Sequence, residues 1–399
     1  MVFVGERCYK IHRIMFMIMG FWPYQKPFIW RMQAVFFFSA YCCIIFSKFA
    51  AFFTTTCNMD CILKKFTYIC LSFIFVLCYC SFYFNSEFIK QALKHMQLDW
   101  KMFENSDTIK IFEEYLFLSY IFALFAIMIV PACLSTLMAL ECRPVILDAI
   151  MPMNVSRPRK LEVEAEYFLD KQEYFYFYLM EELVGLGIGF YLALVIATFC
   201  ITLVRHCCAT LKIASCLIQS TEIVHTLQIP VTQEIQFMHR SICFSVYLHR
   251  RTLKLMKDFM HSIDVWYSPI ILMCVLSLSC VLLRLYNAIL ETNDLYETFM
   301  CCLLLYVCFM YMFITSFLAQ SYTDHSIEIL KFTYDTLWYV APVPIQKLFL
   351  IMQKSIKPHI LVMGGLFVFS MEGFSTDMLE IIIQRVQRGK LLVQKKSKM

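Results

Sequence analysis

The sequence predicts an all-α membrane protein with seven transmembrane helices. Of its 399 residues, 60% are hydrophobic, and the mean hydropathy is +0.65. Only 16% are charged, whereas a typical soluble protein has about 25%. The apolar residues gather in blocks long enough to cross a bilayer as helices, which takes about 20 residues. These three observations together predict one multi-pass membrane domain over 1–399.

The first segment, 1–34, is expected to stay cytoplasmic. Its apolar run is short, ends at Trp22-Pro23 and is followed by no small-residue cleavage site, so it does not look like a signal peptide. The first six of the longer apolar blocks lie within 35–319. The predicted spans are 35–53, 66–84, 116–139, 183–204, 265–287, 299–319 and 359–383.

Two stretches between the spans are also predicted to be helical. The stretch 205–264 has helical periodicity and few turn signals, so we expect the fourth and fifth spans to continue beyond the membrane and pack together there. The stretch 320–358 contains a short two-faced helix over 345–356, with Gln and Lys on the polar side. Its apolar face consists of Ile345, Leu348, Phe349, Met352 and Ile356.

The distribution of Lys and Arg predicts the orientation, because cytoplasmic loops carry an excess of both. With the N-terminus inside, the segments 1–34, 85–115, 205–264 and 320–358 hold 20 of these residues and the three outer loops hold 7. The tail, 384–399, adds six to the outer side without reversing the bias. We therefore expect a cytoplasmic N-terminus and an extracellular C-terminus.

Composition and motifs disfavour several classes of protein. The net charge is +5, and no basic domain is present, so nucleic-acid binding is not expected. The glycine-rich run Val184–Phe190 lies in a predicted span and lacks the strand–turn–helix context of a nucleotide loop. No enzyme site and no cofactor are predicted. The run Arg205–Cys208 lacks a second ligand pair at zinc-site spacing, so no metal site is predicted either.

Aromatic residues, 17% of the chain, predict a site for a small apolar ligand in the outer half of the bilayer. A cavity lined by such residues, with few polar groups, suits that kind of ligand. Gly185 and Gly189 would let a neighbouring helix approach closely, or would leave space for the ligand. For any single residue, contact with the core or with lipid is the simpler alternative. The candidate ligand-binding residues are Tyr68, Phe73, Phe125, Met128, Ile129, Phe190 and Tyr191.

A polar stripe marks the second half of the predicted seventh span. Glu372, Thr376, Glu380, Gln384 and Gln387 follow at spacings of 4, 4, 4 and 3, so on a helix they fall within about 120° of arc. An acidic residue inside a span tends to face water or a partner, and a polar stripe repeated around an axis makes a cation-attracting pore. The alternative is that the helix has left the membrane by Glu380 and the later residues are merely solvated.

The predicted outer loops contain two further candidate sites. Asn154-Val155-Ser156 is the one N-x-[ST] acceptor in the chain, so Asn154 is a candidate glycosylation site. Most of the 20 cysteines lie in the apolar blocks, where Cys behaves as a small hydrophobic residue. Cys57, Cys61 and Cys142 fall in outer loops and are candidates for a single disulfide.

Several stretches resemble the insect odorant receptor family. IHRIMFMIMGFWPYQ resembles that family's N-terminal segment, with its Gly-x-Trp-Pro before the first span, and RHCCATLKIASCLI is similar to the segment after the fourth span. The strongest match runs from Tyr334 to Phe374, YDTLWYVAPVPIQKLFLIMQKSIKPHILVMGGLFVFSMEGF. It carries a Tyr-x-x-x-Trp, the amphipathic Gln-Lys helix, a Gln-Lys-Ser and a Ser-x-Glu-x-Phe. The resemblance covers nearly the whole chain and has a hymenopteran character.

The resemblance implies a ligand-gated, non-selective cation channel. The chain would form a heterotetramer with an odorant co-receptor subunit in the plasma membrane of sensory dendrites. A small volatile or apolar odorant would bind among the second to sixth spans. The seventh helices would surround the pore, and helices within 320–358 would form a cytoplasmic anchor between subunits.

The end of the chain departs from the family pattern. After Phe374 the family continues with an uncharged helix, whereas this chain has Glu380, Arg385 and Arg388 where the narrow pore would lie. Arginine at that depth would oppose cation flow. An atypical terminus, a poorly conducting subunit and a gate supplied mainly by the co-receptor are three explanations that stay open.

Three rival functions are alternatives to this interpretation. A G-protein-coupled chemoreceptor would have the opposite orientation, and the chain lacks both an Asp/Glu-Arg-Tyr after the third span and an Asn-Pro-x-x-Tyr in the seventh. A gustatory-type channel would share the architecture but open without the odorant co-receptor. A non-signalling scaffold would give no ligand-evoked current.

Overall fold

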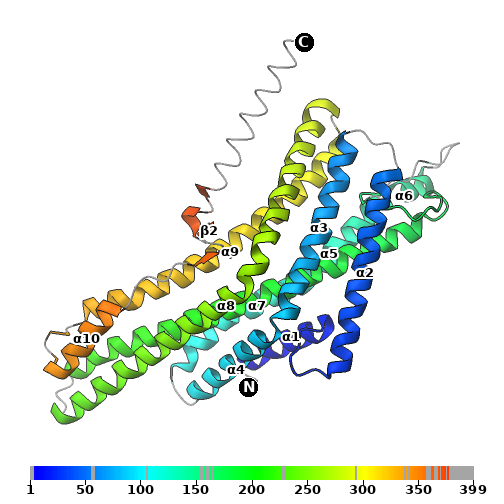
Figure 1. The fold of residues 1–399 in the computed structure, drawn as a ribbon. Helices are drawn as coiled ribbons and strands as arrows, with labels where there is room; N and C mark the ends of the chain where they lie inside the picture. Colours follow the sequence, from blue (N-terminus) through cyan, green and yellow to red (C-terminus); the bar gives the residue numbers. More distant parts are fainter. Residues whose placement is uncertain are drawn as a thin grey trace. The chain divides into compact units, whose positions relative to one another are not determined.

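In the computed structural model the chain is built mainly of long α-helices (Figure 1). The first six are α1 (Val4–Met19), α2 (Pro27–Thr54), α3 (Met59–Phe84), α4 (Ser86–Phe103), α5 (Ile109–Glu141) and α6 (Arg143–Ile150). The later elements are α7 (Phe175–Thr226), α8 (Val231–Asn287), the π-helix η1 (Ala288–Thr292), α9 (Leu295–Asp335), α10 (Val343–Ser355), β1 (Val362–Met363) and β2 (Phe367–Val368). The structure describes residues 4–54, 59–104, 107–151, 157, 161–163, 165–226, 231–292, 294–336, 338–339, 341–355, 361–363, 367–368, 370–373 and 375–376.

Six of the described helices are long and apolar enough to cross a membrane, namely α2, α3, α5, α7, α8 and α9. Each contains one of the first six predicted spans, because hydropathy over about 20 residues is a strong signal. The helices are longer than the predicted spans. α7 has 52 residues and α8 has 57, so the two helices together cover most of the stretch 205–264.

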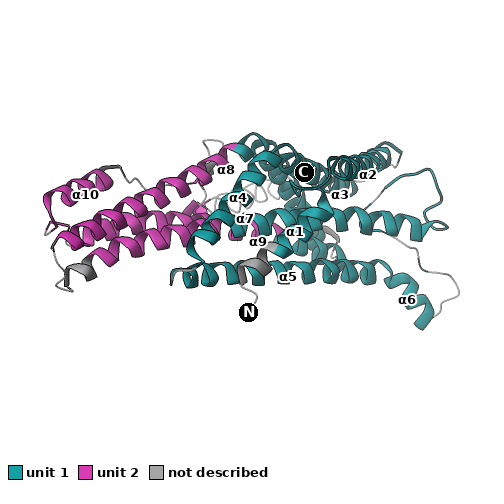
Figure 2. Cartoon of the chain, turned by 90° about the horizontal axis from the view of Figure 1, so that it is seen from below, with its two compact units in different colours: residues 1–203, 262–306 teal, residues 204–261, 307–399 magenta. Residues whose placement is uncertain are grey.

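The chain divides into two compact units (Figure 2). The first comprises residues 1–203 and 262–306, and the second comprises 204–261 and 307–399. Because the boundaries fall inside α7, α8 and α9, each of these three helices contributes residues to both units.

The first unit contains the turn that follows α1. Gly20 has φ +75°, a left-handed conformation that glycine adopts at the end of a helix without strain. The Gln33 side-chain amide donates to the Met17 carbonyl at 2.9 Å, which satisfies a carbonyl at the end of α1. The Arg13 guanidinium lies 5.7 Å from the ring centroid of Trp22. The Gly-x-Trp-Pro stretch is therefore a built turn that fixes α1 against α2.

The second unit contains the two-faced helix that the sequence predicts. In α10 the apolar side chains of Ile345, Phe349 and Met352 are buried, as the i, i+4, i+7 spacing indicates. The Gln353 side-chain amide donates to the Thr333 carbonyl of α9 at 3.1 Å. The Ser245 hydroxyl of α8 donates to the Ala214 carbonyl of α7 at 2.8 Å. Polar bonds to backbone carbonyls thus tie these extended helices together.

The start of the predicted seventh span differs from the expected helix. Val362 pairs with Val368 and Met363 pairs with Phe367, in antiparallel register. The predicted helix over 359–383 therefore does not extend through these four residues. Val362, Phe367 and Val368 are β-branched or aromatic residues, which are enriched in strands.

The glycines of α7 show why this helix packs closely. A Cβ at Gly189 would collide with the Phe75 ring of α3 and lie 2.7 Å from the Tyr41 hydroxyl oxygen of α2. The Tyr41 hydroxyl donates to the Gly185 carbonyl at 2.9 Å. Side chains of α2 and α3 therefore fill the space beside Gly189. This is the packing role that the Gly-x-x-x-Gly motif allows.

Replacing Gly189 tests this packing. Gly189→Ala is expected to lower the free energy of unfolding by about 1–3 kcal/mol, because the new methyl group overpacks the core. The control is Gly187→Ala, whose Cβ would lie 3.1 Å from the flexible end of Leu134 and which also gains helix propensity. Denaturant unfolding of the detergent-purified chain measures both. Equal stability of the two variants would contradict the packing argument.

Candidate functional site

The loop between α6 and α7 enters the first unit instead of staying at its surface. Glu162, Val163 and Ala165 are all buried, and Glu162 is only 1% exposed. The Glu166 N–H donates to the Ser47 carbonyl of α2 at 3.1 Å. A loop that buries a charge this deeply must meet partners there, because an unpaired buried carboxylate is strongly unfavourable.

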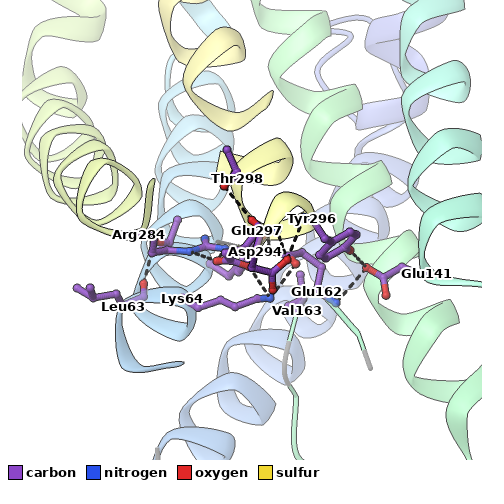
Figure 3. Close-up of polar contacts among 12 residues, drawn as sticks. Leu63, Lys64, Glu141, Glu162, Val163, Arg284, Asp294, Tyr296, Glu297 and Thr298 are labelled. Atoms are coloured by element: carbon purple, nitrogen blue, oxygen red, sulfur yellow. Dashed lines mark hydrogen bonds and ion pairs between the residues drawn. The ribbon is translucent and has the colours of Figure 1, made fainter. Parts of the chain in front are cut away.

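Three donors from two helices meet the Glu162 carboxylate. Figure 3 shows two of them, Lys64 and Arg284. Lys64 of α3 lies 2.7 Å from Oε2. The Tyr68 hydroxyl, one turn further along α3, donates to Oε1 at 2.9 Å. Arg284 of α8 donates to the same Oε1 through Nη2 at 3.0 Å, and its guanidinium carbon lies 5.9 Å from the Tyr68 ring centroid.

A second carboxylate completes the charge balance. Glu297 in the first turn of α9 accepts from Arg284 Nε at 2.8 Å and lies 3.4 Å from Lys64 Nζ. The turn is fixed by Asp294, whose side chain accepts from the Tyr296 N–H at 2.9 Å, as an N-cap residue does. Lys64, Arg284, Glu162 and Glu297, which we call the charge quartet, are formally neutral together.

Two further acids hold the loop by its backbone. The Glu162 N–H donates to Glu141 Oε1 at 3.0 Å, and the Val163 N–H donates to Glu182 Oε1 at 3.3 Å. The Tyr296 hydroxyl donates to the same Glu141 oxygen at 3.1 Å. The ends of α5 and α7 thus bind the two consecutive loop residues whose side chains enter the unit.

The surroundings of Glu162 decide its protonation. Burial by itself would raise the pKa of this carboxyl, but the nearby charges of Lys64 and Arg284 outweigh burial and hold the pKa below its ordinary value. Glu162 is therefore ionised at neutral pH, and the charge quartet is an ionic structure.

An apolar cluster lies directly beside the charge quartet. Tyr68, Val163 and Leu186 form its buried centre. Tyr68 joins the two groups, because its ring packs in the cluster while its hydroxyl binds Glu162. The partly buried residues around this centre are Leu71, Leu134, Leu137 and Phe190.

The structure brings together only part of the predicted ligand-binding set. Tyr68 and Phe190 meet in the apolar cluster. Phe73 and Tyr191 are half-buried, and Phe73 packs edge-on against Phe49 at 6.4 Å between ring centroids. The three candidates on α5 are exposed, as expected for residues that contact lipid. These are Phe125, Met128 and Ile129.

The predicted pore and loop sites lie at the edge of the described chain. Glu372 and Thr376 are exposed, and the Thr376 hydroxyl donates to the Glu372 carbonyl at 2.9 Å, as in a helical turn. Outside the described residues are Glu380, Gln384, Gln387 and Asn154.

Of the three candidate disulfide cysteines, Cys61 is disulfide-bonded and Cys142 is a free thiol. Among the cysteines whose side chains the structure describes, none other than Cys61 is in a disulfide. Cys57, the third candidate, lies outside the described residues.

The charge quartet was not predicted from the sequence, although one signal pointed to it. Arg284 lies inside the predicted fifth span, and an ionisable residue in a span marks a functional or structural partner. The sequence does not show that Glu162 is the partner of Arg284, because the two residues are 122 positions apart in the chain.

No protein-family model matches the sequence, and no curated protein does. Solved structures do. The insect olfactory receptor OR5 from Machilis hrabei aligns over 96% of this chain and 98% of its own, with a TM-score of 0.71 and 14% identity. The chain has the insect olfactory receptor fold. The same receptor in complex with eugenol aligns over the same shares, with a TM-score of 0.72 and 15% identity.

Removing the charge of Glu162 tests its contribution to the charge quartet. Glu162→Gln is expected to lower the free energy of unfolding by about 3 kcal/mol at neutral pH, because Lys64 and Arg284 lose a buried partner. The folded pKa is depressed, so the wild-type advantage is present above the unfolded value and is lost as pH falls through the folded pKa. Denaturant unfolding from pH 7 downward measures it.

Asp148→Asn is the matched control for this variant. Asp148 pairs with Arg157 at 2.7 Å, but both side chains are more than a fifth exposed, so its loss should cost less than about 1 kcal/mol. If the two variants lose equal stability, the burial of Glu162 does not have the assigned role.

Proposed function

We propose that this chain is an odorant-binding subunit of a ligand-gated cation channel. The observation that carries the proposal is the fold shared with an insect olfactory receptor over 96% of the chain. The motifs from Tyr334 to Phe374 add independent support, because they resemble the same family in sequence. A solved receptor of this fold is in complex with eugenol, a small aromatic molecule.

The ligand is proposed to bind beside the apolar cluster in the first unit. Tyr68, Leu186 and Phe190 offer aromatic and aliphatic surface with one polar edge, which is the composition of a site for a small apolar molecule. The buried loop residue Val163 belongs to the centre of this cluster. A ligand bound there would contact Tyr68, whose hydroxyl donates to Glu162 of the charge quartet.

The pore is proposed to lie along the seventh span, beginning at Glu372 and including Thr376, Glu380, Gln384 and Gln387. The orientation would be cytoplasmic at the N-terminus and extracellular at the C-terminus, in the plasma membrane of a sensory dendrite. The chain would form a heterotetramer with a co-receptor subunit.

If Glu372 faces the conduction path, Glu372→Gln should change divalent block while ligand sensitivity stays near wild type.

Whole-cell recording tests the function. Cells expressing this chain with an insect odorant co-receptor are expected to show fast cation current on exposure to some members of a broad volatile panel. Cells expressing the chain alone should show none. Current without the co-receptor would favour the gustatory-type channel. Absence of current in both conditions, with surface expression established, would contradict the channel assignment.

Substitution in the apolar cluster tests the ligand position. Phe190→Ala is expected to lower sensitivity to an activating volatile about fivefold to tenfold, since losing an aromatic contact costs about 1–1.4 kcal/mol. Phe125→Ala is the control, because Phe125 is 62% exposed on α5. Dose–response curves normalised to surface expression measure both. A larger shift for Phe125→Ala would move the site to the α5 face.

A further inference from the structure

The charge quartet has the form of an occupied carboxylate-binding site. Lys64 Nζ, the Tyr68 hydroxyl and Arg284 Nη2 converge on the two oxygens of Glu162 at 2.7, 2.9 and 3.0 Å. Charge-assisted bonds to a carboxylate are about twice as strong as neutral ones. The group they hold belongs to a loop, whereas the three donors are on helices. The donors therefore form a helical receptor for a carboxylate that the loop supplies.

The neighbouring residue of the loop extends this likeness. Val163 follows Glu162 and packs with Tyr68 and Leu186 in the apolar cluster. Glu162 and Val163 together present a carboxylate and a branched alkyl group to adjacent cationic and apolar surroundings. A short branched carboxylic acid would present the same two groups in one molecule.

Exchange of one carboxylate for another would keep the charge balance. If the Glu162 side chain turned away, Lys64, Arg284 and Glu297 would carry one net positive charge, which a ligand carboxylate neutralises. The backbone at Glu162 and Val163 could stay bound to Glu141 and Glu182. An incoming carboxylate would then take the contacts with Lys64 and Arg284 that Glu162 makes in this structure.

Two members of the charge quartet are partly exposed at the protein surface. The side chains of Lys64 and Glu297 are 19% and 22% exposed, whereas those of Glu162 and Arg284 are 1% exposed. A ligand carboxylate can therefore first meet Lys64 and then move inward to Arg284. The Tyr68 ring would place the alkyl chain against the apolar cluster.

We infer that small apolar carboxylic acids bind this chain at Lys64, Tyr68 and Arg284, in competition with the side chain of Glu162. The inference rests on the proposed function and names its ligand class. Glu162 is in this view an internal competitor that holds the site until an acid replaces it. Alcohols and esters of the same carbon skeleton lack the charge and bind weakly.

Equilibrium binding of tritiated 4-methylpentanoate to the full chain in nanodiscs of neutral lipid tests this at pH 7. Glu162→Gln is expected to bind the acid about tenfold more tightly than wild type, because the competing charge is gone. Adding Lys64→Met should remove that gain. Unlabelled 4-methylpentan-1-ol should compete at least tenfold less well than the unlabelled acid.

The control is Glu166→Gln, which removes a loop carboxylate that pairs with Lys171 at 3.1 Å and should leave acid binding at the wild-type level. Equal affinity of Glu162→Gln and wild type, or equal competition by the alcohol, would overturn the inference. If Glu162→Gln does not fold, the wild-type chain decides, since Lys64→Met must abolish its preference for acid over alcohol. The assay records no current, so its result is separate from the recording that tests the channel.

Discussion

The burial of one loop carboxylate is the constraint on which the first unit depends. Taking Glu162 out of water carries a large desolvation penalty, and only good geometry with opposite charges and further hydrogen bonds offsets it. Meeting that requirement involves α3 through Lys64 and Tyr68, α8 through Arg284, and α9 through Glu297, which balances the charge. α5 and α7 add the acids that bind the loop backbone. Four residues near one point thus set the positions of helix ends that lie far apart in the chain.

Hydropathy was enough to predict the six described membrane helices, since each long apolar run carries its own signal. The buried face of α10 was likewise legible from spacing alone, because Ile345, Phe349 and Met352 repeat with the helical period. The contacts between residues that are far apart in the sequence could not be predicted. Lys64 and Glu162 are 98 residues apart, and the sequence shows Glu162 as one of several acids in a polar loop. The same limit applies to the ligand-binding candidates, of which Tyr68 and Phe190 meet whereas Phe125 on α5 is exposed. The helical period predicts which residues share a face of a span, but it does not predict which other helix that face contacts.

The pairing of β1 with β2 sets a condition on any membrane arrangement of that segment. Backbone N–H and C=O groups exposed to lipid are costly, and non-helical backbone at membrane depth is tolerated only where protein or water surrounds it. Two strands of two residues leave most of their edge groups without ladder partners. If this segment lies at membrane depth in an assembled channel, other subunits or an aqueous path must cover it.

The disulfide of Cys61 carries information about biosynthesis. Such bonds form in oxidising compartments and are rare in the cytosol. Under the orientation proposed above, the α3 end that bears Cys61 lies on the luminal side of the secretory pathway. Lys64 lies three residues further along the same helix, so under that orientation the charge quartet lies on the luminal side as well. The quartet can then assemble only after the loop carrying Glu162 has been translocated. A chain made without access to that compartment would lack both the bond and the means to bury Glu162.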